Sequence, residues 1–259
     1  MVDDLIKLER RASHAFLKLN RPSKLNALNT GMWQHMLALI EQAAADDTIR
    51  ALIVCGEGKA FAAGADIAEM KAVVSDPALP SKIASLTYEV QRALNRFSKP
   101  TIAMIRGPCI GGGCGIALCC DIRIADDTAR FGITPAKLGL VYSLSDTKRL
   151  VDAVGVSVAK DILFTGRIML AEEALSIGLI NYLWKPELLE ENVIKFVESI
   201  TSNSQTSMRA NKRVLQMILD GASDDNELTR GLFLDAFSSN DFAEGLSAFN
   251  EKRKPKFTC

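Results

Sequence analysis

Two glycine-rich junctions, each lying between an apolar run and a following helix, have the residue types needed to stabilise an oxyanion. The apolar run ALIVC (51–55) precedes GEGKAFAAGADIAEM, and TIAMI (101–105) precedes RGPCIGGGCGIAL. Free N–H groups at a helix start carry partial positive charge, and small residues let a ligand approach the backbone closely. Two such junctions side by side would present converging donors, suited to a thioester oxygen that becomes an enolate. The alternative is that these glycines serve only tight packing.

The junctions match none of the common nucleotide or nucleophile motifs. Ile116 stands where a GxGxxG fingerprint would need its third glycine, and the chain contains neither a P-loop nor a GxSxG elbow. The two histidines, His14 and His35, are too few for His-based triads or His-rich metal sites to assemble easily. We therefore expect no resident metal.

The composition restricts the partners. The 259 residues include 31 Lys and Arg against 31 Asp and Glu, and a zero formal charge argues against a dedicated nucleic-acid binder. The six cysteines lie mostly in apolar stretches, so we expect small buried hydrophobes and no disulfide framework. The charged start MVDDLIKLER has no apolar signal core, and no run approaches about 18 apolar residues. These features predict a cytoplasmic protein with no membrane partner.

The elements that must position the junctions alternate between strands and helices, which predicts an α/β fold with mostly parallel pairing. The expected elements are two strands within 5–20, a helix over 30–45 with Thr30 as N-cap, a strand at 51–55, a helix starting near Ala65, a helix over 81–97, a strand at 101–105, a helix through Leu118, and strands at 122–125 and 180–184.

After Lys185-Pro186 the apolar pattern is entirely helical. The apolar residues of this segment need a partner surface, so homo-oligomerisation is a reasonable hypothesis. We therefore divide the chain into a core domain, 1–186, and a C-terminal helical oligomerisation region, 187–259.

Five motifs in order resemble the crotonase superfamily, that is, the enoyl-CoA hydratase/isomerase family. They are NRPSKLNAL (20–28), FAAGADIAEM (61–70), GGGCGIALCCDIRIA (111–125), FTGRIMLAEEALSIGLIN (164–181) and EGLSAFNEKRKPKF (244–257). The resemblance covers nearly the whole chain. It implies a crotonase-type spiral of ββα units, a C-terminal helical trimerisation region, and a homotrimer or dimer of trimers. It also implies binding of an acyl-CoA thioester, with coenzyme A as part of the substrate and no separate cofactor.

The resemblance also implies site residues. The oxyanion donors correspond to the backbone N–H groups of Ala65 and Gly112. Phe233 matches an acyl-pocket position, whereas Phe249 and Lys252 match positions that reach the CoA end of a neighbouring subunit. The segment that matches the family's CoA-binding stretch contributes Lys24, Ala63, Asp66, Ile67 and Ala68.

Two departures from the family pattern bear on the reaction. Family hydratases carry a glutamate after the glycine triplet, where this chain has Gly115, and a second one where it has Pro135. Hydration needs a base to activate water and an acid to deliver the α-proton, and glycine and proline can supply neither. Efficient hydratase or isomerase activity is therefore disfavoured, while thioester binding stays compatible with both residues.

The stretch ITPAKLGLVY (133–142) resembles methylmalonyl-CoA decarboxylases of the same superfamily, although those have His at the position of Ala65. Loss of CO2 forms the enolate without a base. Thr134 and Tyr142 could orient the carboxylate, and Tyr142 could protonate the product; the alternative for Tyr142 is a pocket wall with a satisfied hydroxyl. We therefore favour decarboxylation of a malonyl-type CoA, or other non-hydratase lyase chemistry.

Two further hypotheses stay open. One is a hydratase or isomerase that uses a displaced acid such as Asp146, which could equally be a helix N-cap. The other is a non-catalytic acyl-CoA-binding protein. Asp66 and Glu69 fall at the start of an expected helix, where capping is the more common role of acids.

Overall fold

The computed structural model describes residues 5–257, and within that range the strands form a larger and a smaller sheet. The larger sheet has the order β1 (Ile6–Arg10), β2 (His14–Leu19), β3 (Ala51–Gly56), β4 (Thr101–Ile105), β6 (Ile122–Asp126) and β9 (Tyr182–Trp184). The smaller sheet has the order β5 (Pro108–Ile110), β7 (Arg130–Gly132) and β8 (Ile168–Leu170).

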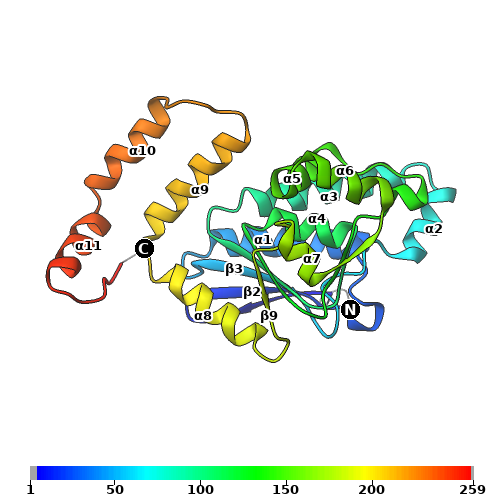
Figure 1. Ribbon diagram of the computed structural model, residues 1–259, viewed down its shortest axis with the longest axis horizontal. Coiled ribbons are helices and arrows are strands. Elements are labelled where there is room, and N and C mark those ends of the chain that lie inside the picture. The colour runs from blue at the N-terminus through cyan, green and yellow to red at the C-terminus, as the bar shows by residue number, and fades with distance from the viewer. Residues whose placement is uncertain (1–4, 258–259) are drawn as a thin grey trace.

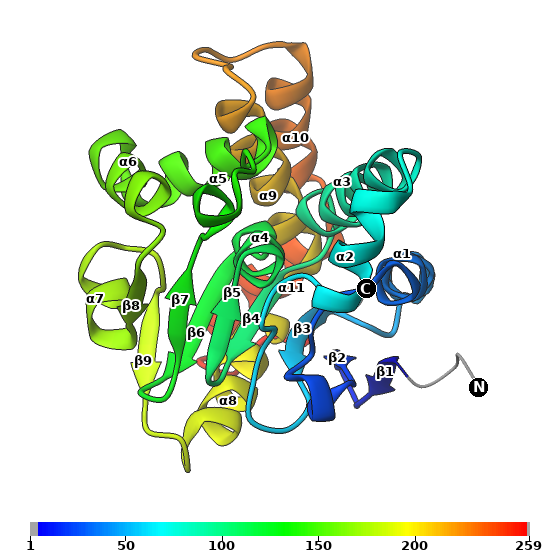
Figure 2. The same cartoon turned by 90° about the vertical axis from the view of Figure 1, so that its right-hand side faces the viewer.

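Most neighbouring strands run parallel, as the alternating sequence pattern predicts. The exceptions in the described chain are the antiparallel pairs β1–β2 and β7–β8. After β4 the chain turns at Gly107 into β5 and then enters α4 (Gly112–Cys119), and after β6 it continues into β7. Each such unit places a long strand in one sheet and a short strand in the other, followed by a helix (Figure 2). The short strands β5, β7 and β8 were not expected from periodicity, because three residues are too few to show it.

The larger sheet is covered on both faces, which explains its nearly continuous apolar strands. Along β3, Leu52 and Val54 belong to the cluster formed with α1 (Thr30–Ala45), α3 (Leu79–Asn95) and α4. Their neighbours Ile53 and Cys55 alternate to the opposite face and pack on Val193 and Val197 of α8 (Leu189–Thr201). Figure 1 shows α8 on one side of the strands and α1 and α4 on the other.

The remaining helices lie around the smaller sheet and at the C-terminus. They are α2 (Ile67–Ser75), α5 (Leu144–Val154), α6 (Val156–Thr165), α7 (Ala171–Ser176), α9 (Gln205–Leu219), α10 (Glu227–Phe237) and α11 (Asn240–Asn250), with 3-10 turns η1 (Pro22–Lys24) and η2 (Pro135–Leu138).

Three expected helix starts differ from those observed, each because another side chain caps the helix. Asn29, not Thr30, caps α1, since its side chain accepts from the N–H of Met32. Helix α2 begins at Ile67 rather than near Ala65, and Asp66 is its N-cap. Ser143 caps α5, so Asp146 lies in the first turn instead of at the N-cap.

The helical C-terminal part has two distinct environments. Helix α8 follows the expected boundary at 186/187 but packs on the larger sheet, so it completes the core. Helices α9, α10 and α11 form an arm that projects from the core (Figure 1). The arm exposes large apolar side chains, listed here: Leu215, Ile218, Phe233, Leu234, Phe237, Phe242, Leu246 and Phe249.

Candidate active site

The two glycine-rich junctions lie side by side. The N–H of Ala62 donates to Pro108 O (2.9 Å), and the N–H of Ile110 donates to Ala62 O (2.9 Å). At Gly113 a Cβ atom would lie 2.6 Å from Ala62 O, so a larger residue would force the start of α4 away from the first junction. The juxtaposition required for converging donors is therefore present.

The backbone around Ala65 directs its N–H toward the second junction. Leu28 bonds to both neighbours of Ala65: its N–H donates to Gly64 O (2.7 Å), and its carbonyl accepts from the N–H of Asp66 (2.9 Å). In a parallel bridge of this kind the intervening residue points its own N–H the other way. The other side of this segment is bordered by β5, which leads into α4.

Both candidate donors are unpaired and follow a glycine in the left-handed region. Within residues 5–257, no hydrogen bond to a protein acceptor uses the N–H of Ala65 or that of Gly112, the first residue of α4. Gly64 has φ +101° and Gly111 has φ +52°, which L side chains rarely adopt. A Cβ on Gly111 would lie 4.0 Å from Gly64 Cα, so the two turns touch.

Gly115 faces three polar groups from other elements. A Cβ built on it would lie 2.6 Å from Gln91 Nε2, 3.0 Å from Asp146 Oδ1 and 3.4 Å from the Tyr142 hydroxyl. These side chains take up the volume into which a residue at this position would extend. Pro135 begins the η2 turn and brings no ionisable group.

Asp146 is anchored on both carboxylate oxygens. Its Oδ1 accepts from Arg149 Nη2 (2.9 Å), and its Oδ2 accepts from the Ser143 hydroxyl (2.7 Å). Gln91 Oε1 accepts from the same Arg149 nitrogen (2.9 Å). Gln91 and Asp146 are buried, so the four residues form a fixed polar network against Gly115.

The Tyr142 hydroxyl is buried and finds no hydrogen-bond partner in the described chain. No protein group of the described chain therefore satisfies this hydroxyl. Burial raises the pKa of Tyr142 well above its usual value, which keeps the hydroxyl protonated and able to donate.

Thr134 precedes η2 and lies two residues after Gly132, whose carbonyl accepts from the N–H of Gly111 (2.8 Å).

The expected CoA-binding residues of the first junction lie together. The N–H of Ala63 donates to Leu25 O (2.9 Å), which brings the exposed Lys24 beside the segment that continues to Ile67 and Ala68. Ile67 is 73% exposed. The backbone of this segment is therefore accessible next to a cation.

Asp66 has a structural role. Its carboxylate accepts from the N–H groups of Ala68 (2.8 Å) and Glu69 (3.3 Å) and pairs with Arg21. The hydrogen bond from Arg21 lowers the pKa of Asp66, with the two backbone donors adding to the effect. Glu69 accepts from the N–H of Thr30 (3.0 Å), so it supports the start of α1. The capping role expected at the start of α2 is confirmed for Asp66, whereas Glu69 acts on α1.

Three expected site residues lie elsewhere in the same chain. Phe233 is on α10, Phe249 is on α11 and Lys252 follows α11. The arm that carries them and helix α2 occupy opposite ends of the long axis in Figure 1. One protomer alone does not bring these residues to Ala65 and Gly112.

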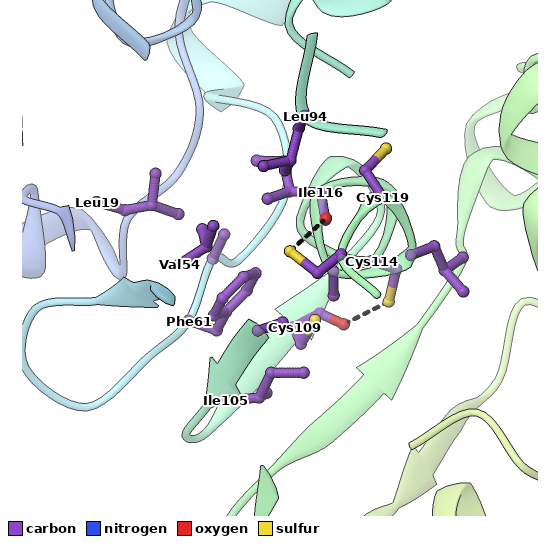
Figure 3. Close-up of a cluster of buried hydrophobic side chains, with 14 of the residues drawn as sticks. Leu19, Val54, Phe61, Leu94, Ile105, Cys109, Cys114, Ile116 and Cys119 are labelled. Atoms are coloured by element: carbon purple, nitrogen blue, oxygen red, sulfur yellow. Dashed lines mark hydrogen bonds between the residues drawn. The ribbon is translucent and has the colours of Figure 1, made fainter. Parts of the chain in front are cut away.

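The cysteines near the site are structural, as the sequence predicts for those described. Cys55, Cys109, Cys114, Cys119 and Cys120 are free and buried, and Figure 3 shows three of them packed with Val54, Phe61 and Ile116. Burial raises the pKa of Cys119 to about 12, so it is a poor nucleophile at neutral pH. Cys259 lies outside the described residues.

Residues 5–257 contain neither a cluster of metal-ligating side chains nor a helix suited to span a membrane. No group of three or more His, Cys, Asp or Glu residues between 5 and 257 could hold a metal ion. No helix in that range has the length and apolar character needed to cross a bilayer.

Sequence reasoning missed Gln91, Arg149 and Ser143. A signal existed for Gln91, because it lies between the buried Val90 and Leu94 at a helical spacing of three from the latter. A polar residue on the buried face of a helix needs a partner, which marks it as a candidate for a site. Arg149 and Ser143 gave no comparable signal.

Comparisons with known proteins agree with this geometry. Residues 9–259 match the sequence model of the family described as enoyl-CoA hydratase/isomerase. The short-chain-enoyl-CoA hydratase of Clostridium acetobutylicum is 37% identical over 252 residues, covering 95% of both chains. The crotonyl-CoA hydratase of Syntrophomonas wolfei subsp. wolfei is 36% identical over 262 residues, covering 99% of both.

A solved structure supports the fold. An enoyl-CoA hydratase/isomerase family protein from Hyphomonas neptunium superposes with a TM-score of 0.95 at 40% identity, covering 98% of this chain and 97% of that one. The ββα units therefore form the crotonase-type spiral that the motifs imply. With its family match, its relatives and its fold in agreement, the chain belongs to the enoyl-CoA hydratase/isomerase family of the crotonase superfamily.

Proposed function

We propose that this enzyme binds an acyl-CoA thioester and stabilises its enolate between the N–H groups of Ala65 and Gly112. The observation that carries the proposal is the pair of unpaired N–H groups at two touching junctions. Such preorganised donors act on charge that develops on the thioester oxygen. Lys24 and the exposed segment beside it are suited to the anionic CoA moiety, which supports the residues assigned above to CoA binding.

The reaction we favour is decarboxylation of a malonyl-type CoA. The bond between Cα and the carboxylate carbon breaks, its electron pair enters the thioester to form the enolate, and CO2 leaves. A proton from water or from Tyr142 then adds to Cα. Gly115 and Pro135 offer no carboxylate, and the hydroxyl of Tyr142 is a protonated donor next to Gly115, so the available groups suit a step that needs no base. Thr134 is proposed to help orient the departing carboxylate.

A second candidate is hydration or isomerisation through Asp146. Its Oδ1 lies 3.0 Å from the Cβ position of Gly115, where a carboxylate on that residue would begin, and two relatives named above are hydratases. Against it, both oxygens of Asp146 are already engaged, one by a cation. A third candidate, non-catalytic thioester binding, needs only the oxyanion donors.

A substrate panel separates the three candidates. Purified protein is mixed in turn with crotonyl-CoA, 3-hydroxybutyryl-CoA and methylmalonyl-CoA, and the products are identified by mass spectrometry. We expect CO2 loss from methylmalonyl-CoA with little change in the other two. Rapid hydration of crotonyl-CoA that disappears in Asp146→Asn would establish the second candidate, and binding without turnover would establish the third.

We further propose a homotrimer or a dimer of trimers, located in the cytoplasm. The exposed aromatic face of the arm supports assembly, because a monomer rarely leaves so many large apolar residues in water. In such an assembly Phe233, Phe249 and Lys252 would serve a neighbour's site rather than their own. Light scattering coupled to size exclusion should give a mass about three or six times that of the chain.

A further inference from the structure

Three polar side-chain atoms converge on Gly115 of α4, which has no side chain of its own. They are Gln91 Nε2, Asp146 Oδ1 and the Tyr142 hydroxyl, at 2.6, 3.0 and 3.4 Å from the Cβ position of Gly115. Gln91 comes closest, and it reaches this point from a different helix, α3.

The orientation of the Gln91 amide follows from its partner. A guanidinium only donates hydrogen bonds, so the atom that faces Arg149 Nη2 at 2.9 Å must be the carbonyl oxygen Oε1. The NH2 group therefore faces Gly115. Gln91 is 2% exposed, so this side chain has little freedom to turn away.

Arg149 is itself fixed, which makes the amide a rigid part of the wall. The same Nη2 donates to Asp146 Oδ1 at 2.9 Å, and Ser143 holds the other oxygen of Asp146. The charges of Arg149 and Asp146 balance each other within this contact. Beside the Asp146 carboxylate, whose oxygens Arg149 and Ser143 already engage, the network therefore presents a neutral N–H donor and a neutral O–H donor at Gly115.

We infer that Gln91 is a specificity-determining residue of this site: its amide occupies the volume of an acid/base carboxylate and offers a donor in its place. The inference rests on the proposed thioester-enolate function. A donor pair at this point favours acyl groups that carry an oxygen acceptor next to Cα, such as a carboxylate. It disfavours reactions that begin by removing a proton from Cα, because an amide cannot accept that proton.

Gln91→Glu tests this directly, because it exchanges one nitrogen for one oxygen and keeps the acceptor that faces Arg149. The new carboxylate can take a proton from Cα while the C–H electron pair enters the thioester, and it can return a deuteron from solvent. A positioned general base contributes about 100-fold or more to such a step. We therefore expect deuterium to enter Cα of butyryl-CoA in D2O about 100-fold faster than with the wild type.

The experiment measures deuterium incorporation by mass spectrometry and butyryl-CoA affinity by calorimetry, on the full chain. Gln91→Met removes the amide without adding a base and should not accelerate exchange. Gln42→Glu adds the same charge on an exposed face of α1 and should behave as the wild type. Should Gln91→Glu fail to fold by circular dichroism, Gln91→Ala with added formate supplies the base, and its exchange rate should rise with formate concentration.

The outcomes are distinguishable. Accelerated exchange with Gln91→Glu, or formate rescue of Gln91→Ala, supports the inference. Butyryl-CoA binding without any acceleration overturns the role of Gln91 and leaves the proposed function intact. If the wild type binds neither butyryl-CoA nor methylmalonyl-CoA, the proposed function is overturned and this inference with it.

Discussion

The two walls of the candidate site differ in what carries their chemistry. One wall consists of main-chain N–H groups at Ala65 and Gly112, aligned by a glycine before each of them. The other wall, around Gly115, consists of side chains from α3 and α5 that hold one another through Arg149. Under the proposed function, the first wall stabilises an anion whatever reaction forms it, whereas the second decides whether a proton can be removed.

The proposed function therefore makes thioester binding and reaction type separable in this fold. Changing the backbone wall should abolish every reaction that passes through an enolate. Changing the side-chain wall should alter which reaction occurs, or how fast, while binding persists. Substitutions on each wall test this distinction, and they follow in order of the size of the expected effect.

The largest effect is expected on the backbone wall, for Gly112→Pro. Proline removes the N–H, and its ring is tolerated at the first position of a helix. The Cβ would lie 3.2 Å from the end of the Leu28 side chain and 3.5 Å from the Trp33 ring, and it would meet no backbone atom among its nearest neighbours. Turnover of the preferred thioester should fall about 10²–10³-fold, the usual cost of one oxyanion donor.

Steady-state kinetics and a thermal melt check this prediction together. Glu227→Pro, at the first position of α10, is the matched control and should keep both activity and melting temperature. Retained activity in Gly112→Pro would remove this N–H from the mechanism.

The next largest effect is expected when a larger residue is placed at Gly115 in the side-chain wall. Gly115→Glu should destabilise the protein by about 2–3 kcal/mol, because its Cβ would displace Gln91 from the contact with Arg149. Restoring carboxylates at Gly115 and Pro135 alone is therefore not expected to create a hydratase.

A double-mutant cycle with Gln91→Ala isolates this conflict. Since the second change clears the space, Gly115→Glu should cost less in the Gln91→Ala background than in the wild type, by urea denaturation. Equal costs in the two backgrounds would mean that Gln91 does not limit the residue at position 115.

A smaller effect is expected for Tyr142→Phe. Losing one neutral donor should lower kcat about five- to tenfold. The same change removes a buried hydroxyl that has no partner, so the melting temperature should stay equal or rise. Because burial raises the pKa of Tyr142, the wild type should lose no activity through this group as pH rises from 7 to about 9. If Tyr142→Phe lowers kcat but leaves its pH dependence unchanged, Tyr142 acts as a hydrogen-bond donor. An unchanged kcat in the variant contradicts this role.

The smallest effect concerns support of the backbone wall by Asp66. Asp66→Asn keeps a capping residue but loses the charge paired with Arg21, at a cost of about 1 kcal/mol at pH 7. The pKa of Asp66 is lowered by folding, so its contribution is present above the unfolded value near 3.9 and is lost as pH falls through the folded value. The difference in unfolding free energy between wild type and variant should shrink from pH 6 toward pH 3. A difference that does not vary with pH would contradict the ion pair.

The sequence predicts the backbone wall better than the side-chain wall for a physical reason. The strands 51–55 and 101–105 are buried on both faces, so these elements can be located from their apolar runs alone. The glycine-rich junctions follow directly from them, and the family resemblance then implies Ala65 and Gly112 as the donors. The cysteines in apolar stretches were predicted to be buried for the same reason.

The side-chain wall depends on contacts between residues far apart in sequence. Gln91 and Arg149 are 58 positions apart, and nothing in either local pattern specifies that they meet. Asp146 was considered as an N-cap or as an acid, yet Ser143 takes the cap and frees Asp146 to face Gly115. Ser and Asp are almost equally favoured as N-caps, so the local sequence does not decide whether Ser143 or Asp146 caps α5. Only the packing of α5 decides this.

The position of Gln91 has a genetic consequence. Glutamine and glutamate codons differ by a single base. One base change therefore replaces the amide that faces Gly115 by a carboxylate. The donors at Ala65 and Gly112 belong to the main chain, and no codon other than that of proline removes them. Single substitutions can therefore change the side-chain wall, and with it the reaction, while most of them leave the backbone donors in place.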